Sequence, residues 1–105
     1  MTPAKGTPGD DDRPPNERRL VEYRGHVQGV GFRAMARAIA REFQVTGYVQ
    51  NMPDGSVRLV AEGPLQELTG FLAAVQNRLA RYLLGADVQT STATGEFEDF
   101  DIRYD

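Results

Sequence analysis

A change in the spacing of apolar residues near residue 32 is the strongest constraint on the fold. Residues 19–27 alternate polar and apolar side chains, which is typical of a strand with one buried face. From residue 32 the apolar residues recur every three or four positions, which predicts a helix with one buried stripe made of Phe32, Met35, Ala36, Ile39, Ala40 and Phe43. A strand and a helix that each bury one side are expected to pack against each other.

A strand hairpin is predicted after this helix. Residues 46–51 and 57–62 are rich in β-branched and aromatic side chains, and a short turn segment separates them. That segment contains residues that favour the backbone angles of a tight turn, namely Pro53, Asp54 and Gly55. Asp54 is therefore expected to be a turn residue.

A second helix and two final strands complete the pattern. Pro64 opens the helix, because proline is tolerated at a first helical position. The apolar stripe of this helix is predicted to be Leu65, Leu68, Leu72, Val75 and Leu79. Gly85 is expected to end this region, and residues 86–92 and 97–104 are expected to form the last strands.

The predicted order of elements defines an α+β fold. Strand, helix, strand, strand, helix, strand, with one extra C-terminal strand, predicts a ferredoxin-like two-layer sandwich: a mostly antiparallel sheet with two helices on one face. Four of the six prolines lie in the first 15 residues, and no apolar periodicity precedes Leu20. We therefore expect residues 1–17 to be a disordered tail and residues 18–105 to be the only domain.

Composition excludes several classes of site. The chain has no cysteine and one histidine, His26, so a disulfide framework, a thiolate nucleophile and a cysteine- or histidine-rich metal centre are excluded, and no metal or other cofactor is expected. The sequence has neither an apolar run of the roughly 18 residues needed to span a membrane nor a secretory signal. We expect a cytoplasmic monomer with no membrane partner.

The segment best suited to chemistry joins the first strand to the first helix. Residues 25–33 read Gly-His-Val-Gln-Gly-Val-Gly-Phe-Arg. Glycines allow backbone N–H groups to converge on an anion, and the helix N-terminus adds unpaired donors. The guanidinium of Arg33 matches two phosphate oxygens. From these residues alone, an anion cradle and a tight structural turn stay equally open. Arg37 and Arg41 continue the stripe of Arg33, and we expect them to be solvated.

Four segments of the chain resemble the acylphosphatase family, over about residues 19–104. The phosphate-loop motif is matched by Gly25-x-Val27-Gln28-Gly29-Val30-Gly31-Phe32-Arg33. A second motif is matched by Gly47-x-Val49-x-Asn51-x-x-Asp54-Gly55-x-Val57, followed by Glu62-Gly63. The family's C-terminal pattern is matched by Phe100-Asp101-Ile102-Arg103-Tyr104. The N-terminal leader is the main departure from the family's minimal form.

The resemblance implies hydrolysis of carboxyl–phosphate anhydrides on a ferredoxin-like sandwich. By position, Arg33 would bind the phosphate and Asn51 would orient the attacking water. The resemblance also implies a phosphate-binding loop made of Val27, Gln28, Gly29, Val30, Gly31 and Phe32. The expected partners are a small acyl phosphate as substrate and inorganic phosphate as product. Neither a metal nor a covalent enzyme intermediate is implied.

The chemistry of an acyl phosphate suits these residues. Its leaving group is a carboxylate, whose conjugate acid has a pKa of about 4, so departure needs no proton donor. Loop N–H groups, one arginine and one amide are then chemically sufficient.

Two rival functions stay open on the sequence alone. One is an acylphosphatase-like domain that binds phosphate groups without turnover or serves a larger carbamoyl-transfer system. The other is an RNA-binding module. An RNA-binding module of this fold needs aromatic residues on the central strands, and residues 57–62 have none. We expect no nucleic-acid partner, and we expect His26 to be solvated or structural.

Overall fold

The computed structural model describes residues 16–104. Within them the elements follow in the order β1 (Glu17–Gly25), α1 (Phe32–Ala40), β2 (Thr46–Asn51), β3 (Val57–Gly63), α2 (Leu65–Leu79), the 3-10 turn η2 (Ala80–Tyr82), β4 (Leu83–Thr92) and β5 (Phe100–Arg103). The expected tail, residues 1–17, lies outside the described residues except for its last two, and Glu17 is the first residue of β1.

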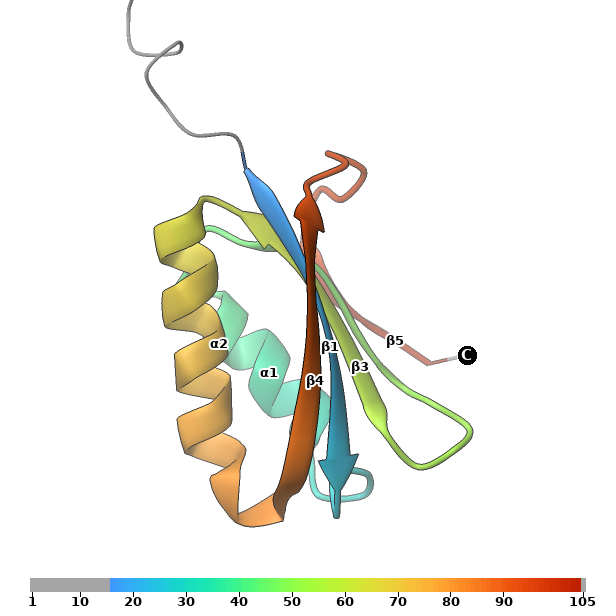
Figure 1. The fold of residues 1–105 in the computed structure, drawn as a ribbon. Coiled ribbons are helices and arrows are strands. Elements are labelled where there is room, and N and C mark those ends of the chain that lie inside the picture. Colours follow the sequence, from blue (N-terminus) through green and yellow to red (C-terminus); the bar gives the residue numbers. More distant parts are fainter. Residues whose placement is uncertain (1–15, 105) are drawn as a thin grey trace, which may run out of the picture.

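The strands form one sheet in the order β4-β1-β3-β2-β5. Neighbouring strands are antiparallel except for β2 and β5, which are parallel. Both helices lie on one face of this sheet, and the other face is left open (Figure 1). This arrangement confirms the predicted ferredoxin-like sandwich with an additional C-terminal strand at the edge beside β2. No helix within residues 16–104 is long and apolar enough to span a membrane.

The core lies between the helices and the sheet. The first predicted stripe is largely confirmed, because Phe32, Ala36, Ile39 and Ala40 are buried. In α2 the buried residues are Leu68, Phe71, Val75 and Leu79, while the predicted Leu65 is 45% exposed. Phe71, which the sequence analysis missed, contacts Phe43 and Phe100 through their rings. One aromatic residue of α2 thus joins the end of α1 to β5.

Several predicted boundaries were wrong. β4 begins at Leu83 and not at residue 86, and β5 covers Phe100–Arg103 and not residues 97–104. β1 ends at Gly25 and not at residue 27, because the chain packs closely there: a Cβ on Gly25 would lie 2.3 Å from the carbonyl oxygen of Tyr82. Gly85 does not end the helical region, since it lies inside β4 against the guanidinium of Arg24. Pro64 precedes α2 in an extended conformation, and its carbonyl accepts the hydrogen bond from Leu68 N at 2.9 Å.

Candidate active site

The glycine-rich loop between β1 and α1 presents backbone N–H groups at one end of the sheet. Gly29 and Gly31 have φ angles of 79° and 81°, in the region that favours glycine. Gly31 caps α1, and its carbonyl accepts the first helical hydrogen bond from Met35 N at 3.0 Å. The N–H groups of the first turn of α1 have no helical partner, and the helix dipole adds positive potential there.

Gln28 connects this loop to the β2–β3 hairpin. Its side-chain Nε2 donates to the carbonyl oxygens of Met52 and Ser56, both at 2.8 Å. Asp54 is a turn residue, as predicted, because its carboxylate accepts hydrogen bonds from the backbone N–H and the hydroxyl of Ser56. The side chain of Gln28 therefore fixes the loop against the strand that carries Asn51.

Arg33 lies in the first turn of α1, and the C-terminal segment holds its side chain. Its Nη1 donates to the carbonyl oxygen of Arg103 at 3.3 Å. Its Cζ lies 4.8 Å from the ring centroid of Tyr104, a distance typical of a cation–π contact. Within residues 16–104 no carboxylate forms an ion pair with this guanidinium. Its positive charge is therefore not neutralised by a described acidic residue.

Asn51 and Arg33 line the same pocket. Asn51 is the last residue of β2, is half-buried and pairs with Val57 across the hairpin. The pocket has a volume of about 170 Å³ and is lined by Val27, Gly29, Gly31, Phe32, Arg33, Ala34, Asn51, Ile102 and Tyr104. Segments far apart in the sequence thus meet around one small space that combines N–H donors, a guanidinium and an amide.

Two expected loop residues do not line this pocket. Gln28 directs its side chain to the hairpin, and Val30 packs against the core. Ile102 and Tyr104 do line it, and no role in the site was predicted for them although the C-terminal pattern was noticed. Their contribution depends on β5 lying beside β2, a long-range pairing that no local pattern reveals.

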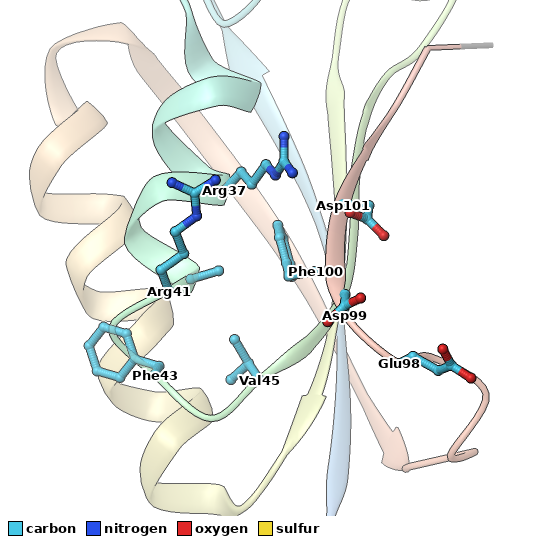
Figure 2. Close-up of a pocket in the computed structure, with 9 residues that line it drawn as sticks. Arg37, Arg41, Phe43, Val45, Glu98, Asp99, Phe100 and Asp101 are labelled. Carbon is cyan, nitrogen blue, oxygen red and sulfur yellow. The ribbon is translucent and has the colours of Figure 1, made fainter.

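A larger pocket lies between α1 and β5. Its volume is about 330 Å³, and its lining includes Arg37 from α1, Arg41 directly after α1, and Phe100 from β5. Figure 2 shows the two guanidinium groups on the α1 side of this space. The two pockets thus follow one another along the same helix and the same strand.

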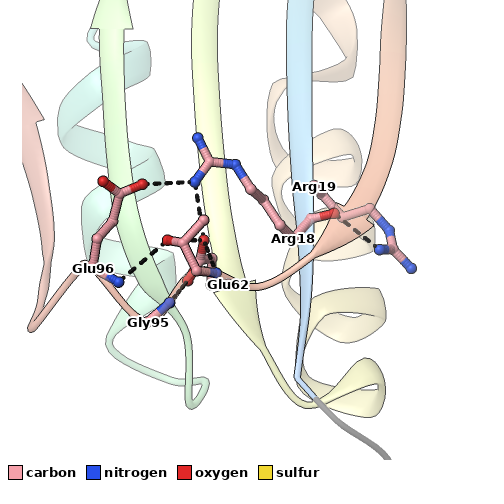
Figure 3. Close-up of polar contacts among 6 residues, drawn as sticks. Arg18, Arg19, Glu62, Gly95 and Glu96 are labelled. Carbon is pink, nitrogen blue, oxygen red and sulfur yellow. Dashed lines mark hydrogen bonds and ion pairs between the residues drawn. The ribbon is translucent and has the colours of Figure 1, made fainter.

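Glu62 belongs to the sequence motif that resembles acylphosphatases, but it lines neither of these two pockets. It lies near the C-terminal end of β3, away from the end that pairs with Asn51. Its side chain is only 3% exposed. Its carboxylate accepts hydrogen bonds from Arg18 at 3.0 Å and from the backbone N–H of Gly95 at 2.9 Å (Figure 3). It also accepts from the backbone N–H of Thr94 at 2.9 Å and from the Thr94 hydroxyl at 2.8 Å. Burial by itself raises the pKa of Glu62, but these hydrogen bonds outweigh it and hold the pKa below its usual value. Glu62 is therefore a structural residue that ties the segment after β4 to the sheet.

Replacing this carboxylate should lower stability. Glu62→Gln puts an amide NH₂ among four donor groups, and we expect a loss of about 3 kcal/mol in the free energy of unfolding, measured with urea at neutral pH. Because the folded pKa is lowered, the native carboxylate stabilises the chain above the ordinary carboxyl range. That contribution is lost as the pH falls through this range to the folded pKa. The variant should therefore lose less stability in acid. Glu42→Gln, at an exposed position, is the control, and equal stability of the two variants would contradict the structural role.

Arginines on the open face of the sheet contact acidic or aromatic side chains. Three of them contact carboxylates: Arg18 with Glu62, Arg24 with Asp87, and Arg58 with Glu22. Tyr48 on β2 is covered by Arg103, whose Cζ lies 3.7 Å from the ring centroid. Among residues 16–104, no group of three or more His, Asp or Glu side chains is arranged to hold a metal ion.

Comparison with known proteins identifies the family. The Acylphosphatase family model matches residues 20–102. The chain is 40% identical to the acylphosphatase of Syntrophotalea carbinolica over 85 residues, which cover 80% of this chain and 92% of that protein. It is 49% identical to the acylphosphatase of Salinibacter ruber over 81 residues, which cover 75% of this chain and 84% of that protein.

Solved structures agree. The crystal structure of acylphosphatase from Bacillus subtilis matches 85% of this chain and 99% of its own, with a TM-score of 0.73 and 32% identity. Full-length HypF, in its phosphate- and nucleotide-bound form, shares the fold over 88% of this chain and 12% of its own, with a TM-score of 0.73 and 24% identity. The sequence motifs, the sandwich and the family match agree, and the chain belongs to the acylphosphatase family.

Proposed function

We propose that this chain hydrolyses the carboxyl–phosphate anhydride bond of small acyl phosphates and releases a carboxylate and inorganic phosphate. The observation that supports this most strongly is the pocket of about 170 Å³ that is lined by the glycine-rich loop, Arg33 and Asn51. It combines anion-binding groups with a neutral amide able to hold a water. Membership in the acylphosphatase family supports the same reaction.

The phosphoryl group is bound by the loop and by Arg33. Backbone N–H groups around Gly29 and Gly31 and the N-terminus of α1 donate to its oxygens. The guanidinium of Arg33 contacts two oxygens through its planar fork, and Tyr104 and the Arg103 carbonyl hold it in place. These donors are fixed before the reaction, so they stabilise the charge that builds on the transferring group.

Asn51 positions the attacking water. Its amide oxygen accepts a hydrogen bond from the water, and its NH₂ group can donate to the water or to a phosphate oxygen. The water oxygen bonds to phosphorus as the bond from phosphorus to the acyl oxygen breaks, and the electron pair of that bond leaves with the carboxylate. The proton of the water passes to a phosphate oxygen. Because a carboxylate is a good leaving group, no general acid is required.

A substrate panel tests this proposal. We expect release of inorganic phosphate from acetyl phosphate and benzoyl phosphate in the presence of a chelator such as EDTA, and far slower release from p-nitrophenyl phosphate, whose leaving group is poorer. Phosphate release is measured directly. Activity only on the monoester, or only with an added divalent cation, would contradict the proposal. Binding of inorganic phosphate without turnover of any acyl phosphate would instead favour a non-catalytic phosphate-binding module.

The proposal includes a monomeric, cytoplasmic enzyme. All the residues that line the pocket belong to one chain, so the site needs no second copy. The absence of cysteine fits a reducing compartment, in which disulfides are rare. The proposed reaction involves no cofactor, nucleic acid or membrane.

A further inference from the structure

Two arginines extend the cationic face of α1 beyond the candidate active site. Arg37 and Arg41 follow Arg33 at intervals of four residues, so all three lie near one face of the helix. With a rise of 1.5 Å per residue, they lie about 6 and about 12 Å farther along the helix axis than Arg33. Both are exposed, and within residues 16–104 neither forms an ion pair. They therefore offer two positive charges beside the site that are not held by a described carboxylate.

These charges border an open pocket. The pocket of about 330 Å³ has an apolar floor of Phe43, Val45 and Phe100 and a wall that carries Arg37 and Arg41 (Figure 2). Phe100 lies two residues before Ile102, which lines the candidate active site, so the two pockets are neighbours along β5. One pocket therefore lies beside Arg33 and the next lies beside Arg37 and Arg41.

Acidic residues also border this pocket, but their carboxylates point elsewhere. Phe100 and Ile102 face the helices, so Asp99 and Asp101, at alternate positions, face the other side of the sheet. Figure 2 shows the carboxylates of Asp101 and Glu98 directed away from the two guanidinium groups. The wall on the helix side is therefore cationic.

We propose that this pocket is an acyl subsite that favours substrates with a second anionic group on the acyl portion. The inference rests on the proposed function, because it takes the phosphoryl group to be bound at Arg33. In this proposal the acyl group extends from Arg33 along α1 into the neighbouring pocket. Its carbon skeleton lies over Phe100 and Val45, and a distal carboxylate or phosphate binds Arg37 and Arg41. The two arginines are exposed, as the sequence predicts, and in this proposal they are specificity-determining residues.

A pair of matched substrates tests the subsite. Benzoyl phosphate and 4-carboxybenzoyl phosphate differ only in a carboxylate at the far end of a rigid ring. The quantity to measure is the ratio of their kcat/KM values for the unmodified chain and for R37Q/R41Q. We expect the unmodified chain to favour the carboxylated substrate by about 5-fold, mostly through KM, because charge pairs at exposed positions are weak. The double variant should lose this preference.

The ratio of the two kcat/KM values distinguishes a specific subsite from a general attraction of anions to the protein surface. The double variant R78Q/R81Q removes the same charge from α2 and η2, and we expect it to keep the preference. An equal ratio in all three proteins would overturn the subsite while leaving the proposed function intact. Failure of the unmodified chain to hydrolyse either substrate would instead contradict the proposed function. The single variants R37Q and R41Q give the same test where the double variant folds poorly.

Discussion

Arg33→Lys is expected to reduce kcat/KM for acetyl phosphate by at least about 10²-fold. Lysine keeps the positive charge but lacks the planar fork that contacts two phosphate oxygens, and it cannot stack on Tyr104 as a guanidinium does. Inhibition by inorganic phosphate should weaken as well, because the product uses the same donors. Phosphate release under steady-state conditions gives both quantities.

The control for this variant is Arg78→Lys. Arg78 is an exposed residue in the last turn of α2 and lines neither pocket, so the same substitution there should leave the kinetics unchanged. Circular dichroism and thermal unfolding show whether each variant is folded. Near-native kinetics of a folded Arg33→Lys variant would refute the assignment of Arg33 as the phosphate-binding arginine.

The fold was predictable because the buried faces of its helices and strands follow the local spacing of apolar residues. The stripe from Phe32 to Ala40 and the alternation that includes Val21 and Tyr23 identify faces that are buried in the structure. The errors arose where contacts between residues far apart in the sequence determine where an element begins or ends. The close approach of Gly25 to Tyr82 ends β1 early, and the packing of Gly85 against Arg24 keeps that glycine inside β4. Neither contact is indicated by the residues that neighbour these glycines in the sequence.

The candidate site was predictable in part for a similar reason. Arg33 and the loop are close in sequence, and Asn51 belongs to a second recognisable motif. The contacts that position these residues are long-range: Gln28 bonds to the hairpin, and the last residues of the chain hold Arg33. Arg37 and Arg41 could not be distinguished from a solvated stripe, because only the structure places a cavity beside them.

Asn51→Ala is expected to lower kcat for acetyl phosphate by about 10²–10³-fold, by analogy with the loss of an oxyanion donor. The phosphoryl group is still held by the loop and by Arg33, so KM should change little. A selective loss of kcat distinguishes a residue that orients water from one that binds phosphate. Asn77→Ala, at an exposed position of α2, is the matched control.

Asn51→Asp separates orientation from charge. Aspartate retains one acceptor oxygen at the same position, but it loses the NH₂ donor and adds a negative charge close to the phosphate. We therefore expect both a lower kcat and a higher KM, since like charges repel across the small pocket. If a carboxylate at this position could act as a general base, Asn51→Asp would be faster than Asn51→Ala and its rate would rise with pH. Normal rates in both variants would remove Asn51 from the mechanism.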